Sequence, residues 1–192
     1  VLVETGAGRR IFLLPVETFP GHVNNVYFVD DPALPPLFDV ATTSGHAELA
    51  QRFQELRDRF GVRVGLAEIR LAIISHAHLD HFGGAHWFHE RGGPLAIHEL
   101  DARVLAMFGE RLALASRDLL IFFRHAGVEE ELSRKMMEMY RAGKHFFTDL
   151  EPDRRPRHGH PPVLWCVMEA RARSTSFLGL DRDRAALGFK TG

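Results

Sequence analysis

The chain has 192 residues, of which 45% are hydrophobic and 26% charged, and this composition excludes a fibrous repeat and wholesale disorder and favours one globular domain. Its formal net charge of −1 provides no basic field, so we expect no nucleic-acid partner. No apolar run approaches the roughly 20 residues that cross a bilayer, and the single cysteine, Cys166, allows no intrachain disulfide, so we expect a cytoplasmic protein without a membrane partner.

The first elements that the sequence indicates are short β-strands. Apolar runs at 11–14 and 26–29 predict a pair of strands, separated by the turn-forming residues Pro20, Gly21, Asn24 and Asn25. A third strand is expected at Leu37 and Phe38, after a proline-rich segment, and it ends at Asp39.

A helix is predicted over 46–60, with Ser44 as its cap and Gly61 as its end. Its apolar residues recur at the spacing of one helical face: Leu49, Phe53, Leu56 and Phe60. The segment 70–75 then contains four apolar residues without alternation, which is typical of a strand buried on both faces.

The second half of the chain begins with a short helix over 84–91 and a strand at 94–97. Two or three consecutive helices follow, as a helical insertion at about 99–145. We expect the methionines and aromatic residues of 136–147 to be core, with a substrate-facing lid as the alternative. We therefore divide the chain into a metal-binding region, 1–150, and an Arg- and Pro-rich tail, 151–192, in which only 163–168 resembles a strand.

The chemistry of the chain is concentrated in the hexapeptide His76-Ala77-His78-Leu79-Asp80-His81. Imidazole nitrogen and carboxylate oxygen are ligands suited to zinc or to divalent iron or manganese. His76 and His78 are two residues apart at a strand end, so their side chains point to the same side and can share one ion. Asp80 and His81 follow in a turn and can reach a second ion. This spacing suits a two-metal site that activates water.

The hexapeptide, followed by Gly83-Gly84, resembles the signature of the metallo-β-lactamase superfamily, which includes glyoxalase II-like hydrolases. Residues 25–28 resemble the early strand of that family, and Phe38-Asp39 its Asp-Thr-Gly segment. Here that segment reads Asp39-Val40-Ala41, and the missing glycine argues against a supporting role for Asp39. The resemblance implies an α/β fold, an αββα sandwich, which we expect to be incomplete at the C-terminus.

The resemblance also implies a ligand set. His76 and His78 would bind the first metal ion and Asp80 and His81 the second, as Zn²⁺ or alternatively as Fe or Mn, and Asp80 would also be catalytic by orienting the attacking water. The family adds a third histidine, a bridging aspartate and a last histidine. His160, beside His158, is the candidate for the third histidine, with a solvated loop as the alternative, and neither Asp181 nor Asp183 is assigned to the bridge.

The function that follows is a metal-dependent hydrolase that uses metal-activated water on an ester, thioester, lactone or amide, with a small-molecule substrate. An iron-dependent sulfur oxygenase on the same scaffold is one alternative. The other is a truncated, non-catalytic half-domain that keeps part of the metal site. Such a half-domain would leave apolar strands uncovered and would aggregate or form a homodimer.

Overall fold

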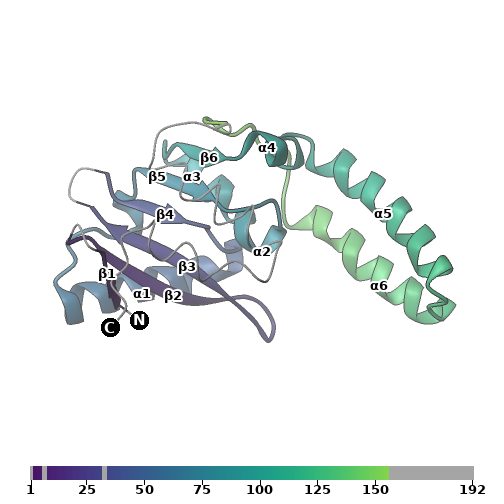
Figure 1. Cartoon of the computed structure of the whole chain (residues 1–192), viewed down its shortest axis with the longest axis horizontal. Helices are drawn as coiled ribbons and strands as arrows, with labels where there is room; N and C mark the ends of the chain where they lie inside the picture. The colour runs from purple at the N-terminus through teal and green to yellow at the C-terminus, as the bar shows by residue number, and fades with distance from the viewer. Residues whose placement is uncertain (1, 6–7, 32–33, 156–192) are drawn as a thin grey trace.

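The computed structural model describes residues 2–5, 8–31 and 34–155. These residues form a mixed α/β fold around one six-stranded sheet (Figure 1). The strands lie side by side in chain order: β1 (Leu2–Glu4), β2 (Arg10–Phe19), β3 (His22–Asp30), β4 (Pro36–Phe38), β5 (Leu71–Ile74) and β6 (Leu95–Ile97). Pairing is antiparallel from β1 to β4 and parallel from β4 to β6.

The hairpin of β2 and β3 is longer than the sequence suggested. Only Pro20 and Gly21 lie in the turn, where Gly21 has a φ of 76° that suits a tight hairpin. Inside the ladder Asn24 pairs with Val16 and Asn25 pairs with Pro15. The prediction that both asparagines form the turn was therefore wrong. Since side chains alternate along a strand, Asn24 is half-buried on the inner face and Asn25 is exposed.

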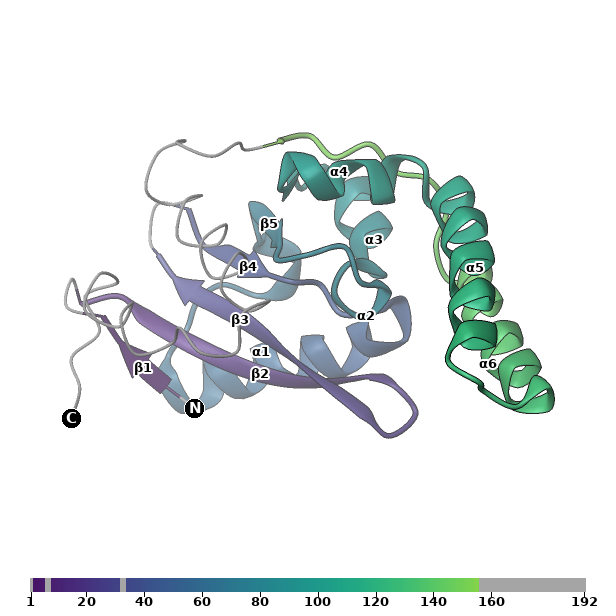
Figure 2. The ribbon, with the colours of Figure 1, turned by 45° about the vertical axis from the view of Figure 1, so that its right-hand side comes forward.

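Helix α1 (His46–Phe60) occupies the predicted range and lies against one face of the sheet (Figures 1 and 2). Its buried face contacts the strands, and the rings of Phe28 and Phe53 meet edge to face at 5.0 Å. Gly61 ends the helix in the left-handed conformation, as expected. Ser44 does not cap it: a 3-10 turn, η1 (Thr43–Gly45), precedes the helix, and the Ser44 hydroxyl lies 2.9 Å from the Thr42 hydroxyl.

Strand β5 is buried along its whole length, as its continuous apolar run predicted. Ala72 and Ile74 belong to the main core with α1 and α3 (Ala85–Glu90), whereas Leu71 and Ile73 form a smaller cluster on the opposite face of the sheet. Between β4 and β6 the chain also forms η2 (Leu66–Glu68) and α2 (Leu79–Phe82). The strands β4 and β6 and the helix α3 were all predicted from the sequence.

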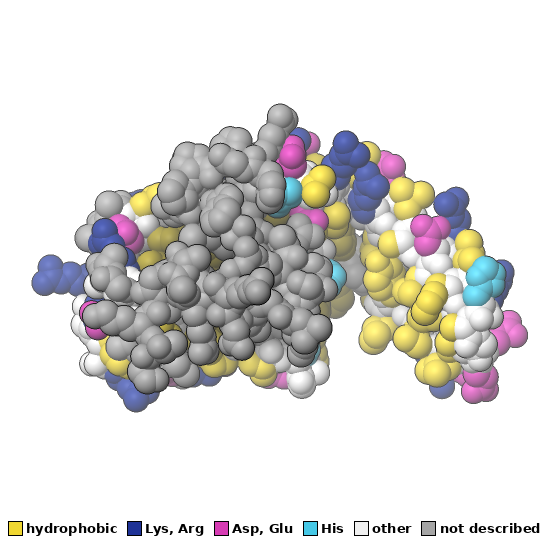
Figure 3. All heavy atoms as spheres, in the orientation of Figure 1, with side chains coloured by type: hydrophobic (Ala, Val, Ile, Leu, Met, Phe, Trp, Pro, Cys, Tyr) yellow, Lys and Arg dark blue, Asp and Glu magenta, His cyan; other side chains and the backbone are white. Residues whose placement is uncertain are grey.

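The helical insertion consists of α4 (Glu99–Ala106), α5 (Phe108–His125), α6 (Glu130–Ala142) and the 3-10 turn η3 (Gly143–His145). Helices α5 and α6 form a hairpin that extends from the body of the protein (Figures 1 and 2). A two-helix hairpin buries little more than the seam between its helices. Met137 is accordingly buried, and Phe147 is buried in the main core against Phe82 and Phe108. The expectation of core was wrong for Met136, Met139, Tyr140 and Phe146. Hydrophobic side chains are visible on the hairpin surface in Figure 3.

The first residues of the region expected to be a separate tail contact the sheet. Arg154 forms a parallel bridge with Ala96 of β6, and the carboxylate of Asp153 accepts a hydrogen bond of 2.8 Å from the Leu95 amide. The strand predicted at 163–168 lies outside the described residues. Among the helices of the described ranges, none is long and apolar enough to cross a membrane.

Candidate metal centre

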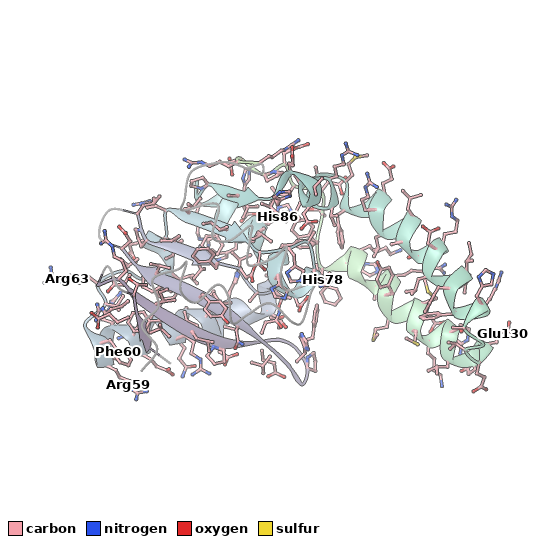
Figure 4. All side chains as sticks on the ribbon, viewed as in Figure 1. Arg59, Phe60, Arg63, His78, His86 and Glu130 are labelled. Carbon is pink, nitrogen blue, oxygen red and sulfur yellow. The ribbon has the colours of Figure 1, made fainter. Side chains whose placement is uncertain are left out.

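The His-Ala-His-Leu-Asp-His hexapeptide begins directly after β5, at the carboxyl edge of the parallel part of the sheet. His78 is the N-cap residue of α2, so Asp80 and His81 lie in the first turn of a short helix and not in a free turn as predicted. Figure 4 shows His78 at the end of the body that lies next to the base of the α5–α6 hairpin. The motif therefore lies at the end of the body nearest the helical insertion.

The four predicted ligands lie close to one another. His76 Nε2 and His78 Nδ1 face each other at 2.8 Å, the ring centroids of His76 and His81 are 4.1 Å apart, and His81 Nε2 lies 3.4 Å from Asp80 Oδ2. As the side chains stand in the part of the chain that the structure describes, no three His, Cys, Asp or Glu side chains meet around one point that could hold an ion. The ligands are thus neighbours whose donor atoms face one another in pairs.

Asp39 is the residue that organises this cluster, contrary to the sequence expectation. The residue is only 5% exposed, and its carboxylate accepts hydrogen bonds of 2.8 Å from the Ser75 amide, the Ser75 hydroxyl and His81 Nδ1. The lost glycine does not prevent the turn, because Ala41 adopts the left-handed conformation with a φ of 55° and Asp39 does so at 63°. Asp39 therefore supports the motif although its segment departs from the family pattern.

The hydrogen bonds around Asp39 fix which imidazole nitrogens carry protons. A carboxylate only accepts, so His81 must donate through Nδ1–H, and Ser75 must use its single hydroxyl proton toward Asp39. The Ser75 oxygen, 3.0 Å from His76 Nδ1, can then only accept from that nitrogen. In the neutral state both His76 and His81 consequently present an unprotonated Nε2, which is the form that binds a metal.

Electrostatics act on two of the ligands. Burial alone would lower the pKa of His81, but the hydrogen bond and charge of Asp39, with the charge of Asp80, outweigh it and raise the pKa above its ordinary value. Burial alone would raise the pKa of Asp80, but the hydrogen bond from Asn24 and the charge of His81 outweigh it, so the pKa is lowered. Asp80 is therefore held in the ionised form.

The β2–β3 hairpin supplies two further contacts that sequence reasoning missed. Asn24 donates a hydrogen bond of 2.6 Å from Nδ2 to Asp80 Oδ2, and His22 Nε2 lies 3.2 Å from the same oxygen. Asn24 was missed because it was assigned to the turn. It lies two residues before the apolar Val26, and residues two apart in a strand share a face, so the sequence could have indicated an inward side chain. No sequence signal pointed to His22.

Two other residues hold the backbone of the motif. The carboxylate of Asp101, buried at the start of α4, accepts a hydrogen bond of 3.2 Å from the Ala77 amide. Gly84 packs so closely that a Cβ there would overlap Nε2 of His46 and lie 2.5 Å from the Val40 carbonyl oxygen. Gly84 therefore allows close approach of the backbone after α2 to the segment that follows β4.

Two histidines that follow the motif in the chain have other partners. His86 contacts the carbonyl and hydroxyl oxygens of Thr148, and His98 caps α4 by accepting from the Leu100 amide. The candidate third ligand, His160, lies outside the described residues, as do His158, Asp181 and Asp183. The structure thus brings together His76, His78, Asp80 and His81, and leaves the third ligand as a prediction.

The donor set fits a zinc-class divalent ion. Neutral imidazole nitrogens and an ionised carboxylate are the ligands that such an ion prefers, and His81 is oriented by a carboxylate in the manner common to histidine ligands. The nitrogens of His76 and His78 that face each other are those that one shared ion would contact.

Comparisons with known proteins show what the chain is similar to. The family model described as the metallo-beta-lactamase superfamily matches residues 20–167. Native FEZ-1 metallo-beta-lactamase from Legionella gormanii is similar in fold, with a TM-score of 0.50 and 13% identity over 81% of this chain and 46% of that chain. A metallo-beta-lactamase family protein from Thermus thermophilus has a TM-score of 0.49 and 22% identity, over 67% of this chain and 42% of that one.

The chain thus spans less than half the length of either solved structure. No curated protein matches it. The family match covers well over half of the chain and includes every residue from the β2–β3 hairpin tip to α6. The protein therefore belongs to the metallo-β-lactamase superfamily.

Proposed function

We propose that this protein is a metal-dependent hydrolase of small molecules with an ester, thioester, lactone or amide bond. The observation that supports this most is the convergence of His76, His78, Asp80 and His81 at one edge of the sheet, with Asp39 bonded to His81 and, through Ser75, linked to His76. A histidine cluster that served only the fold would not need two imidazoles oriented with their Nε2 atoms unprotonated.

In this proposal His76 and His78 would hold the first Zn²⁺, and Asp80 and His81 would hold the second. A bound divalent ion lowers the pKa of water and polarises the carbonyl that is attacked. Asp80 is kept ionised by its neighbours, so its carboxylate can accept a hydrogen bond from the attacking water and orient it. Asp39 and Ser75 keep His81 and His76 in the tautomer whose Nε2 is free for an ion.

The substrate class is proposed from the chemistry of such a centre. Water activated at a metal attacks an acyl carbon, and esters, thioesters, lactones and amides share that carbon. FEZ-1 is described as a metallo-β-lactamase, and a β-lactam is a cyclic amide, so β-lactams belong in the panel of compounds to be tested.

The test combines metal content with hydrolysis. We would purify the chain without chelator and measure metal per chain by elemental analysis, together with hydrolysis of p-nitrophenyl acetate, a thioester, a lactone and a β-lactam. The double variant His76→Ala/His78→Ala removes the first ligand pair, and His89→Ala, a half-exposed histidine outside the cluster, is the matched control.

The expected result is about two equivalents of metal and measurable hydrolysis in the wild type and in His89→Ala, with both lost in the double variant. Little metal in any of the three would contradict the proposal and favour the non-catalytic alternative. Bound iron with oxygen uptake in the presence of a thiol, without hydrolysis, would replace the hydrolase by the sulfur oxygenase.

A further inference from the structure

We propose that Asn24 is a positioning residue that fixes the direction of the Asp80 carboxylate through a hydrogen bond to its Oδ2 atom. The inference rests on the proposed function, because it assigns a role to Asn24 at the same centre. It adds the β2–β3 hairpin to the elements that build the site, which the hexapeptide alone does not include.

Three groups approach the same carboxylate oxygen. Asn24 Nδ2 lies 2.6 Å from Asp80 Oδ2, His22 Nε2 lies 3.2 Å away and His81 Nε2 lies 3.4 Å away. The contact from Asn24 is the shortest of the three. Two of the three approach from the β2–β3 hairpin, whose turn separates His22 from β2. One oxygen of Asp80 is therefore held from a separate element, which limits rotation of the carboxylate about its own bond.

The chemistry of the three groups distinguishes Asn24 from the other two. A carboxamide has N–H donors at every pH and no ionised form in water, so its hydrogen bond to a carboxylate is permanent. An imidazole nitrogen that binds a metal has no proton to donate, so His81 Nε2 cannot serve both the ion and Asp80 as a donor. Asn24 therefore stays a donor when His81 is bound to metal, and unlike His22 it needs no particular tautomer to donate.

The position of Asn24 is fixed by the sheet. It pairs with Val16 of β2, and its side chain lies on the same face of β3 as the fully buried Val26. The backbone on both sides of the ladder is hydrogen-bonded, and the short asparagine side chain has few rotamers, so little freedom is lost when the contact to Asp80 forms. A residue placed in this way preorganises its partner.

The neighbouring Asn25 provides a matched control. It has the same side chain, lies in the same strand and pairs with Pro15, but it is exposed on the opposite face. Asn24→Ala removes the donor to Asp80. Asn24→Asp keeps the shape and places a second carboxylate beside Asp80, where the two negative charges repel each other. Asn25→Ala leaves the hydrogen bond from Asn24 to Asp80 in place and adds no charge beside Asp80.

The experiment measures Zn²⁺ binding by competition with a chromophoric chelator, kcat and KM on p-nitrophenyl acetate, and urea unfolding of the metal-free chains. In Asn24→Ala we expect the second equivalent of Zn²⁺ to bind about 10- to 100-fold more weakly while the first is retained. We expect kcat to fall by a similar factor with KM changed less than about threefold, since Asn24 contacts Asp80 and not the substrate. Asn24→Asp should lose more Zn²⁺ affinity and more kcat than Asn24→Ala.

The two hypotheses fail in different ways. A wild type that binds no Zn²⁺ overturns the proposed function, and this inference with it. A wild type that binds two equivalents but hydrolyses nothing overturns the proposed function, and the Zn²⁺ titration then decides the inference. If Asn24→Ala binds metal as Asn25→Ala does, or weakens both equivalents only in proportion to its loss of folding stability, Asn24 does not position Asp80.

Discussion

Asp39 Oδ2 lies 2.8 Å from His81 Nδ1, and this contact joins the turn after β4 to the helix α2 across a long separation in the chain. The same carboxylate also accepts from the Ser75 amide and hydroxyl, at the end of β5. One buried side chain therefore sets the relative positions of the strand end and the helix that carry the hexapeptide.

The first prediction concerns the charge of Asp39. Asp39→Asn keeps the shape but replaces an acceptor by an N–H group toward Ser75 or His81, so one hydrogen bond is lost and the main cause of the raised His81 pKa disappears. Zn²⁺ affinity should fall about 10- to 100-fold, and the His81 pKa, followed by NMR in the metal-free chain, should fall. Asp118→Asn, which changes an exposed carboxylate on α5, is the control. Equal Zn²⁺ affinity in both variants would contradict the role of Asp39.

The second prediction concerns Gly84. In Gly84→Ala the new Cβ overlaps His46 Nε2 and approaches the Val40 carbonyl, so the backbone after β4 must shift. Such overpacking typically costs about 1–3 kcal/mol, which urea unfolding would detect. Gly109→Ala is the control, because among the described residues the only atom within 4 Å of its added Cβ is Asp149 Oδ1, at 4.0 Å. Gly109 lies in the helix α5. Similar stabilities of the two variants would show that the close packing at Gly84 is not required.

The sequence was sufficient where structure depends on neighbours in the chain. The apolar spacing of α1 and the continuous apolar run of β5 are local patterns, and both elements lie where they were predicted. The hexapeptide was recognised for the same reason, since its four candidate ligands lie within six residues. Ser44 does not cap α1 because it lies within the 3-10 turn η1, which places Gly45 at the N-cap position.

The sequence was insufficient where a side chain acts on a distant partner. Asp39 and Asn24 reach the hexapeptide only through the order of strands in the sheet, which no local pattern states. The missing glycine at Ala41 was overvalued because a non-glycine residue can occupy the left-handed region at a moderate cost, of about 1–2 kcal/mol. The spacing of apolar residues in the α6 segment correctly indicated a helix. Such spacing does not predict whether another element covers the apolar face of that helix, and much of the face of α6 is exposed.

The third prediction concerns the buried and exposed methionines of α6. Met137 of α6 is 3% exposed in the seam with α5, whereas Met139 is 74% exposed. Met137→Ala should destabilise the protein by about 2–5 kcal/mol, because it leaves a cavity, and Met139→Ala by less than about 0.5 kcal/mol. Urea unfolding of the two variants compares the same substitution on two different faces of one helix. A large loss in Met139→Ala would show that the open face of α6 is covered by another part of the protein or by a second copy.

His46 gives the fourth prediction, because it is a buried histidine outside the metal centre. Its Nε2 donates to the Val40 carbonyl oxygen at 3.2 Å, while Nδ1 is buried without a hydrogen-bond partner among the described residues. The rings of Trp87 and Phe88 pack against it. Burial, with a smaller contribution from the charge of Arg91, lowers the His46 pKa, and the hydrogen bond to Val40 compensates only in part.

A lowered histidine pKa makes the folded state less able to bind the proton than the unfolded chain. The unfolded chain takes up this proton as the pH falls through about 6.5, so the His46 contribution favours unfolding below that pH and vanishes above it. From this residue alone the free energy of unfolding of the metal-free chain should therefore decline between pH 7.5 and 5.5, by at most about 1.4 kcal/mol per pH unit. The raised pKa of His81 acts in the opposite direction, so the test is the difference in slope between the wild type and a variant at residue 46. His46→Gln cannot titrate, so its decline should be shallower, although its stability at pH 7.5 is lower because the packing changes. His125→Gln, at an exposed histidine near the end of α5, serves as the control, and equal slopes in all three chains would mean that His46 takes up its proton as readily in the folded protein as in the unfolded chain.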